Sequence, residues 1–355
     1  MKKTILALAV PAALLVAGTA TAANVYKTDT QSVDVYGHVE VDLTHAGSDT
    51  SDSGSHTGKS GTDVQNDLSS YGRLGMKGST KVTDNMTAFG RAEWKVAGQN
   101  SDGDQFSTRY MYMGLDFGDA GNVKFGQAAV PLYTNVMSIV DIFDEWGYEA
   151  QADVYGGSST RVSNQVIYSN DFGPVTFQGS YQFHDESGTV NKKNNYGTGS
   201  KVQNSAYSAT VSYHTGVGLN VRAGYARQNY DASASKNTWA MGLDYTMNNL
   251  YLAALYDGSK ATNSSDVDSN VAGYDLVAAY TMGKTRVYTG YGIQRLSGDA
   301  MTGTKTAINA YKLGAEYNFT SNFLSWVEYR HNNGSADGTN GYAPNEFAVS
   351  GEYKF

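Results

Sequence analysis

Three things are scarce in this sequence of 355 residues: it has no cysteine, only four prolines, and no long apolar run beyond its first residues. Without cysteine the chain forms no disulfide, so an exported protein of this size must be held together by its internal hydrogen bonds and packing. No stretch after residue 22 approaches 18 consecutive apolar residues, which excludes a transmembrane helix. The prolines lie outside the segments predicted below to be strands, where a missing N–H would break a ladder.

The first 22 residues have the three parts of a secretory signal peptide. Lys2 and Lys3 give a positive start, residues 5–16 are apolar apart from Pro11, and residues 20–22 form an A-x-A cleavage motif. The apolar run is too short to cross a bilayer as a helix, which disfavours a membrane anchor. We therefore expect residues 1–22 to be cleaved off and residues 23–355 to form the exported domain.

The remaining composition is polar, with 40 glycines, 27 tyrosines and a mean hydropathy of −0.42. Two classes of exported protein have such a composition: a secreted β-sandwich or adhesin, and a transmembrane β-barrel, whose apolar face is hidden by alternation. The net charge is −8, and loss of Lys2 and Lys3 with the signal peptide makes it −10. We expect no nucleic-acid partner, because nucleic-acid binding requires a basic surface.

Apolar and polar residues alternate with a period of two in several segments. At the C-terminus one face carries Phe347, Val349, Gly351, Tyr353 and Phe355, and similar runs lie at 33–43, 239–245 and 311–319. Successive side chains of a strand point to opposite faces, so each segment has one apolar and one polar face. Soluble strands usually have about five or six residues, whereas about ten tilted residues cross a membrane. The length of these segments therefore favours the barrel.

The connections between these segments are alternately short and long. Short turns are predicted near 83–85, 118–121, 171–174, 215–218, 247–249, 282–284 and 320–322. Longer polar connections are predicted near 46–68, 99–105, 129–158, 186–203, 232–236, 258–269, 298–304 and 332–344. Short periplasmic turns and long outer loops are typical of outer-membrane barrels. The sequence thus predicts an all-β fold, a 16-stranded antiparallel transmembrane β-barrel with both chain ends on the short-turn side.

A barrel of sixteen strands is wide enough to leave an aqueous channel. The long connection at 129–158 is partly apolar, with Val136, Met137, Ile139, Val140, Ile142, Phe143 and Trp146. We expect such a loop to fold inward, to pack on the wall and to constrict the pore. It would carry into the lumen the carboxylates of Asp141, Asp144, Glu145, Glu149 and Asp153. Their spacing is not that of a Ca²⁺-binding loop, which disfavours a metal site within this segment.

Four arginines have the parity of the polar face. Arg73 is opposite in parity to Leu74 and Met76, Arg91 alternates with Ala92 and shares its side with Glu93, Arg109 alternates with Tyr110 and Tyr112, and Arg161 alternates with Val162. An arginine facing lipid costs about 2–4 kcal/mol near the bilayer midplane, so inward placement is favoured. Arginines opposite the loop carboxylates would give a transverse field that favours small polar solutes and sets ion preference.

These motifs resemble those of the general, non-specific trimeric porins of Gram-negative outer membranes. Residues 23–27 and 33–37 are similar to the family's opening strand, 71–78 to its second strand, 108–109 to the start of its fourth, and 141–147 to its constriction-loop motif. The terminal Phe355 is like the family's assembly signal. The resemblance covers most of the exported chain and is strongest over 24–150 and at the C-terminus.

The resemblance implies a homotrimeric, passive diffusion channel for small hydrophilic solutes and ions in the outer membrane of a Gram-negative bacterium. The implied partners are outer-membrane lipid, lipopolysaccharide and the barrel assembly machinery, with no cofactor and no bound metal. By position, the family's constriction corresponds to the basic residues Arg73, Arg109 and Arg161 and to the acidic residues Asp141 and Glu145. The parity and loop arguments above add Arg91 and Asp144.

The sequence departs from the family pattern at several positions. His38 stands where a lysine is common, and Asp144 replaces a proline, so the constriction becomes more negative and mild cation preference is expected. Segment 99–105 is shorter than the loop that family trimers lay over a neighbouring subunit. Asp102 matches the acid of that loop, but Gln127 replaces the arginine that the acid usually meets.

Other functions remain open. A substrate-selective porin for oligosaccharides would need an aromatic path along the lumen, and Tyr36 and Tyr288 have inward parity, although most aromatic residues have lipid-facing parity. We do not expect an enzyme, because none of the six histidines lies in an H-E-x-x-H motif or accompanies a G-x-S-x-G sequence. A receptor or adhesin role of the outer loops would be compatible with a pore.

Overall fold

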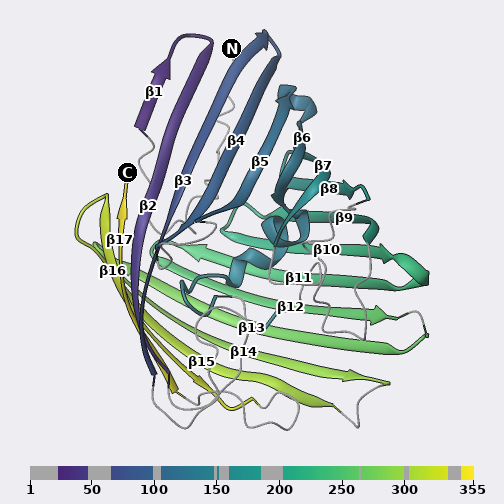
Figure 1. Cartoon of the computed structure of the whole chain (residues 1–355), viewed down its shortest axis with the longest axis vertical. Coiled ribbons are helices and arrows are strands. Elements are labelled where there is room, and N and C mark those ends of the chain that lie inside the picture. The colour runs from purple at the N-terminus through teal and green to yellow at the C-terminus, as the bar shows by residue number, and fades with distance from the viewer. Residues whose placement is uncertain are drawn as a thin grey trace.

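The computed structural model describes residues 23–46, 65–98, 105–147, 150–151, 160–184, 203–263, 265–299, 304–334 and 345–355. The expected signal peptide at 1–22 lies outside these residues, as do Asp102, Glu149 and Asp153. The described chain is nearly all strand (Figure 1). The strands are β1 Ala23–Lys27, β2 Gln31–Ala46, β3 Gln65–Thr83, β4 Met86–Ala97, β5 Phe106–Asp116, β6 Asn122–Ala129, β7 Arg161–Phe172, β8 Val175–Gln182, β9 Gln203–His214, β10 Leu219–Tyr230, β11 Ser235–Met247, β12 Leu250–Thr262, β13 Asp268–Met282, β14 Thr285–Gly298, β15 Lys305–Asn318, β16 Phe323–Asn332 and β17 Asn345–Lys354.

Sixteen of these strands, β2 to β17, close into an antiparallel barrel. Each pairs with the next along the chain, and β17 returns to pair with β2, placing Val349 opposite Leu43. The predicted fold class is therefore confirmed, and all seven predicted short turns join neighbouring strands. Five of these turns contain a residue with positive φ; Asn248 supplies it between β11 and β12, and Gly283 between β13 and β14.

The short strand β1 lies in line with β17 along the same edge of β2. Phe355 exchanges two backbone hydrogen bonds with Gly37, of 2.9 and 3.0 Å, and Ala23 pairs with Val35. The two ends of the folded chain therefore meet beside β2, and together they supply the strand that β2 needs along its whole length. Figure 1 shows β1 continuing beyond the C-terminal end of β17.

The two faces of the sheet differ as the alternation predicts. Apolar side chains such as Leu43, Leu313 and Tyr353 are 47–57% exposed on the outer surface. On the inner side of β15 and β16, Lys312, Glu316 and Glu328 are at most 3% exposed. An apolar outer band and a polar interior are the arrangement of a barrel that surrounds water and is itself surrounded by lipid.

The helical turns of the described chain are short. They are η2 Gly118–Ala120, η3 Leu132–Val136, η4 Met137–Val140 and η5 Asp231–Ser233. Among the described residues, none of them is long or apolar enough to cross a bilayer. The turns η3 and η4 lie in the connection between β6 and β7 and contact β9 to β13, so this connection lies inside the barrel (Figure 1).

Candidate pore constriction

The connection between β6 and β7, called the inner loop below for its described residues 130–147 and 150–151, packs on the barrel wall through its apolar side chains. Of the apolar residues that predicted this infolding, all except Trp146 are buried to 5% exposure or less: Val136, Met137, Ile139, Val140, Ile142 and Phe143. Val130 and Leu132 join the same cluster, together with Leu255, Val277 and Tyr288 of the wall. The cluster stabilises the infolded position, because unfolding of the loop would expose this apolar surface to water.

The wall makes room for the inner loop with glycines on its inner face. A Cβ placed at Gly224 would lie 2.7 Å from Cδ1 of Leu132, and one at Gly290 would lie 2.8 Å from Cε2 of Phe143. A Cβ at Gly242 would overlap Cδ1 of Ile139. At these positions any residue other than glycine would collide with the loop, so the glycines allow its close approach to the wall. The glycines were visible in the sequence, but their role depends on the loop that covers them.

Hydrogen bonds from the wall satisfy the backbone of the inner loop. Arg222 donates to the carbonyl of Asn135 at 3.1 Å, and Tyr251 donates to the carbonyl of Ile139 at 2.7 Å. The side chain of Asn135 donates to Thr210 and accepts from Ser212, both at 3.0 Å. A loop inside a barrel needs such partners, because an unpaired backbone group enclosed by protein is costly.

The tip of the loop is fixed by two charged residues of the wall. Glu328 accepts hydrogen bonds from the backbone N–H groups of Asp144 (2.9 Å) and Glu145 (3.1 Å), and from the hydroxyl of Tyr288 (2.9 Å). Lys312 donates to the carbonyl oxygens of Trp146 (2.6 Å) and Gly147 (3.2 Å). Charge-assisted hydrogen bonds of this kind are roughly twice as strong as neutral ones, so they set the position of the loop carboxylates.

The three predicted loop acids all lie in the lumen, and their surroundings disfavour full ionisation. Burial raises the pKa of Asp141 to about 6, although a hydrogen bond from Tyr133 acts in the other direction. Desolvation and the neighbouring Asp42 raise the pKa of Glu145 to about 8. The side chain of Asp144 faces the lumen and is accessible there, but many protein atoms of the wall surround it. The resulting desolvation, together with the nearby Glu328, raises the pKa of Asp144 well above the usual range.

The predicted arginines face the lumen from β3, β4, β5 and β7. Arg91 and Arg109 both bind Glu93, with Nη2 of Arg91 at 2.5 Å from one carboxylate oxygen and Nε of Arg109 at 2.7 Å from the other. The hydroxyl of Tyr36 donates to Glu93 at 2.8 Å. Glu93 thus neutralises part of the arginine charge and fixes the orientation of both guanidinium groups.

The parity argument for Arg109 was wrong in one respect. Tyr110 lies opposite Glu93, and Tyr112 lies opposite Arg91, so both tyrosines share the inner face instead of facing lipid. The register of β4 and β5 shifts at this point, and Arg109 is the extra residue that has no partner on β4. Such a bulge turns Arg109 inward despite its position next to Tyr110. A bulge of this kind leaves no signal in simple alternation.

The other two arginines lie near the loop. The guanidinium of Arg161 is 5.7 Å from the ring centroid of Tyr110, and Arg73 lies opposite His38 in the pairing of β2 with β3. Both arginines, together with Lys312, lie near enough to Asp141 to favour its ionised form. Asp141 is therefore the loop acid that has the basic residues of β3 and β7 among its neighbours.

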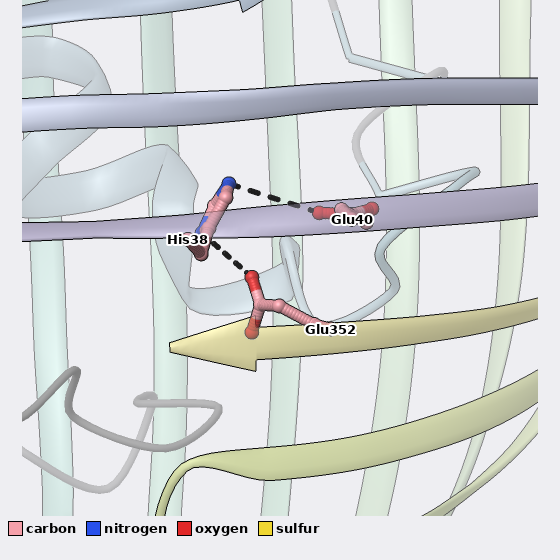
Figure 2. A group of neighbouring side chains, drawn as sticks. All are labelled: His38, Glu40 and Glu352. Carbon is pink, nitrogen blue, oxygen red and sulfur yellow. Dashed lines mark ion pairs between the residues drawn. The ribbon is translucent and has the colours of Figure 1, made fainter. Parts of the chain in front are cut away.

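Asp144 and Glu145 are surrounded instead by further carboxylates of the wall. Their neighbours include Glu40 and Asp42 on β2, Glu328 on β16 and Glu352 on β17. His38, where the family has a lysine, contacts Glu352 at 2.7 Å through Nδ1, and its Nε2 is 3.9 Å from Glu40 (Figure 2). The lumen thus has a basic arc on β3 to β7 and an acidic arc on β15 to β17 and β2.

The prediction missed several lumen residues that share this arrangement. Lys95, 4.5 Å from the ring of Tyr71, belongs to the basic arc, and Glu316, Glu328, Glu352, Glu40 and Asp42 form the acidic arc. Period two in the sequence places Glu40, Asp42, Glu316 and Glu352 on the polar faces of their strands, but it does not identify them as neighbours of the loop tip. Their proximity to the loop tip comes only from closure of the barrel between β17 and β2.

Comparison with known proteins agrees with this geometry. The family model described as Gram-negative porin matches residues 7–337. Outer membrane porin F of Escherichia coli O6:K15:H31 (strain 536 / UPEC) is 31% identical, over the whole of both chains. The chain belongs to the Gram-negative porin family. It is therefore an outer-membrane channel protein and not an enzyme, as the sequence predicted.

Solved structures of porins share the fold. OmpF of Salmonella typhi, in complex with daunomycin, superposes with a TM-score of 0.75 at 22% identity, covering 93% of this porin and 99% of that chain. An anion-selective porin from Comamonas acidovorans gives a TM-score of 0.71 at 18% identity, covering 92% and 100%. Since an anion-selective channel has the same fold, ion preference must be argued from the lumen residues.

We expect Gly242→Val to displace the inner loop, because the added side chain would overlap Ile139. The wall blocks movement outward, so the loop should move toward the pore axis and lower the single-channel conductance. Overpacking of this kind also costs about 1–3 kcal/mol of unfolding free energy. Gly351→Val is the control, since a Cβ there meets nothing closer than 4.0 Å. Equal conductance of Gly242→Val and the wild type would contradict the packing described.

The pKa of Asp141 predicts a pH dependence of ion selectivity. A carboxylate with a pKa of about 6 is about nine-tenths ionised at pH 7 and about one-tenth ionised at pH 5. Cation preference, measured as the reversal potential across a salt gradient, should therefore fall as the pH is lowered through 6. Asp141→Asn should lack the part of this change centred near pH 6. Identical pH profiles for variant and wild type would exclude Asp141 as the titrating group.

Proposed function

We propose that this porin is a passive diffusion channel for small hydrophilic solutes and ions, with mild cation preference. The observation that carries the proposal is the infolded loop, which places Asp141, Asp144 and Glu145 inside the lumen and is anchored there by Glu328 and Lys312. Basic residues lie on the neighbouring arc of the wall. A transverse field of this kind orders water and makes passage of apolar solutes unfavourable.

The charge balance supports a mild preference and not a strong one. Glu93 is bound by two arginines, so it adds little to the attraction for cations. With a pKa of about 8, Glu145 is mostly protonated at neutral pH, whereas Asp141, with a pKa of about 6, is mostly ionised. The acidic arc still contains more carboxylates than cationic partners, since Lys312 is directed at loop carbonyls and Lys354 is 2.8 Å from Glu352.

The remaining proposals concern export and assembly. We propose that residues 1–22 are removed as a signal peptide, which would leave the new chain end at Ala23, beside Phe355 and β2. Phe355 would serve as the signal read by the barrel assembly machinery, and lipid and lipopolysaccharide would surround the apolar outer band. Family membership supports a homotrimer. Gln127 donates to backbone carbonyls of Thr108 and Arg109 in its own chain, so a loop from a neighbouring subunit would need another partner.

The tyrosines of the lumen bear on the alternative of an oligosaccharide-selective porin. Four tyrosines, Tyr36, Tyr71, Tyr110 and Tyr112, lie on the inner face of β2, β3 and β5, which is more than parity predicted. Their rings are already covered in part by cations: Arg91 is 4.1 Å from the centroid of Tyr110, and Lys95 is 4.5 Å from that of Tyr71. A sugar would have to displace these cations to stack on the rings, so passive diffusion is the better supported reading.

Neutralising the loop acids should lower the cation preference. We expect the double variant Asp141→Asn, Glu145→Gln to shift the reversal potential across a KCl gradient at pH 9 toward the value for anions, because both carboxyl groups are ionised at that pH and both charges are lost. The matched control is Asp116→Asn at the end of β5, an exposed acid outside the inner loop. Unchanged reversal potentials in the double variant would refute the assignment of these two acids to the constriction.

Liposome swelling separates the two transport classes. For a passive pore, the swelling rate should decline smoothly as sugars increase in size, and it should rise in proportion to sugar concentration. A binding site for oligosaccharides would instead give saturation at low concentration. Saturation that is lost in the variant Tyr110→Ala would establish the sugar-selective alternative and overturn passive diffusion.

A further inference from the structure

Three carboxylates from distant parts of the chain meet at the constriction. They are Glu40 and Asp42 on β2 and Glu145 in the inner loop, and one oxygen of each lies within 4.8 Å of the others. Period two places Glu40 and Asp42 on the same inner face. The position of Glu145 is fixed independently, because its backbone N–H binds Glu328 on β16. The cluster is therefore held by two separate parts of the fold.

Within the described part of the chain, the most buried member of the cluster has only one weak donor outside the cluster, and its other close polar neighbour is the carboxyl group of Glu145. Asp42 is 1% exposed, and its Oδ1 has no hydrogen-bond donor among the described residues. Its Oδ2 receives only a long hydrogen bond of 3.5 Å from Ser69. An enclosed carboxylate oxygen that is left without a partner is costly, so this geometry points to a partner of another kind.

Protein cations in the described chain are directed elsewhere. No lysine or arginine of the described ranges lies within 4.0 Å of the carboxylates of Asp42 or Glu145. His38 is the nearest candidate for Glu40, but its Nδ1 is engaged by Glu352 at 2.7 Å, while its Nε2 remains 3.9 Å from Glu40 (Figure 2). Lys95 and Arg73 are near enough to act on the cluster electrostatically, but among the described residues neither makes an ion pair with its carboxylates.

We propose that Glu40, Asp42 and Glu145 bind a hard divalent cation, Ca²⁺ in preference to Mg²⁺, at the constriction of this porin. Carboxylate oxygens are the ligands that both ions prefer. Ca²⁺ takes six to eight oxygen ligands at about 2.3–2.6 Å in a flexible geometry. Mg²⁺ demands near-ideal octahedral geometry at about 2.0–2.1 Å and gives up its water ligands reluctantly. Carboxylates held by a strand and by a loop tip are not disposed as an octahedron, which Mg²⁺ demands and Ca²⁺ does not, so the site favours Ca²⁺. Water in the lumen would fill the remaining positions.

Binding would have two consequences. The ion would join the loop tip to β2, on the side of the barrel where Glu328 and Lys312 do not reach. It would also offset negative charge beside the loop tip in the lumen, and so reduce the attraction for monovalent cations. Only this second consequence rests on the proposed pore, because binding of Ca²⁺ can be measured without recording a channel current.

Calorimetric titration tests the site directly. We would titrate CaCl₂ into the purified mature protein, refolded in detergent without lipopolysaccharide so that the cation sites of that lipid are absent. The expected result is one Ca²⁺ per chain with a Kd of about 0.1–1 mM, the range of extracellular calcium sites, and weaker binding of Mg²⁺. Asp42→Asn and Glu145→Gln should each weaken Ca²⁺ binding at least tenfold.

Glu316→Gln is the matched control. It removes the same charge from an equally buried carboxylate of the acidic arc, outside the cluster, and should keep the wild-type affinity. Absence of saturable binding in the wild type, or equal weakening in all three variants, would overturn the proposal. Glu145 lies in the loop and not in a strand, so the Glu145→Gln result stands even where Asp42→Asn fails to fold, which circular dichroism would show.

Single-channel recording gives the second readout. At constant ionic strength in KCl, added Ca²⁺ should lower the conductance of the wild type and Glu316→Gln to a plateau, and should have no such effect in Glu145→Gln. A Ca²⁺ effect of equal size in all variants would contradict the site. Absence of any channel current without Ca²⁺ would instead refute the proposed pore, so the two failures are distinguishable.

Discussion

The closed ring of backbone hydrogen bonds is the constraint on which the rest of this porin depends. Inside hydrocarbon no water can satisfy a free N–H or C=O, and each such group costs several kcal/mol. Pairing of β17 with β2 removes the last free edges of the sheet. Alternation of apolar and polar residues, the absence of proline from the described strands, and the charged interior all follow, because every strand then has one face toward lipid and one toward water.

A ring of sixteen strands creates a lumen that its own side chains do not fill, and the inner loop narrows it. The packing works only because both partners are adapted: the loop supplies Ile139 and Phe143, and the wall supplies Gly242 and Gly290 beneath them. At the tip the apolar contacts end and charged residues take over, with Glu328 accepting from two backbone N–H groups. Position of the loop, and hence of its carboxylates, is thus set by the wall.

Much of the fold was predictable because period two is a local property of the chain. It placed the strands, the lumen-facing Tyr36 and Tyr288, and the polarity of each face. It failed at Tyr110 and Tyr112, because the bulge at Arg109 changes parity without any change in composition. Period two also could not predict the contacts of Asp144 and Glu145, for another reason. Closure of the barrel brings these acids next to Glu40 and Asp42, which lie about a hundred residues earlier in the sequence. A local sequence pattern contains no information on contacts at that separation.

The two arcs of the lumen differ in how their charge is compensated. On the basic arc, Glu93 sits between Arg91 and Arg109, and guanidinium groups lie over tyrosine rings, so the positive charges have fixed partners. On the acidic arc, Glu328 receives backbone N–H groups and Tyr288, while Asp42 keeps an oxygen with no donor among the described residues. Uncompensated negative charge in a narrow lumen must be met by protons or by mobile cations. Desolvation and the neighbouring carboxylates raise the pKa of Glu145, which is the response by protons, and the proposed cation preference would be the response by mobile cations.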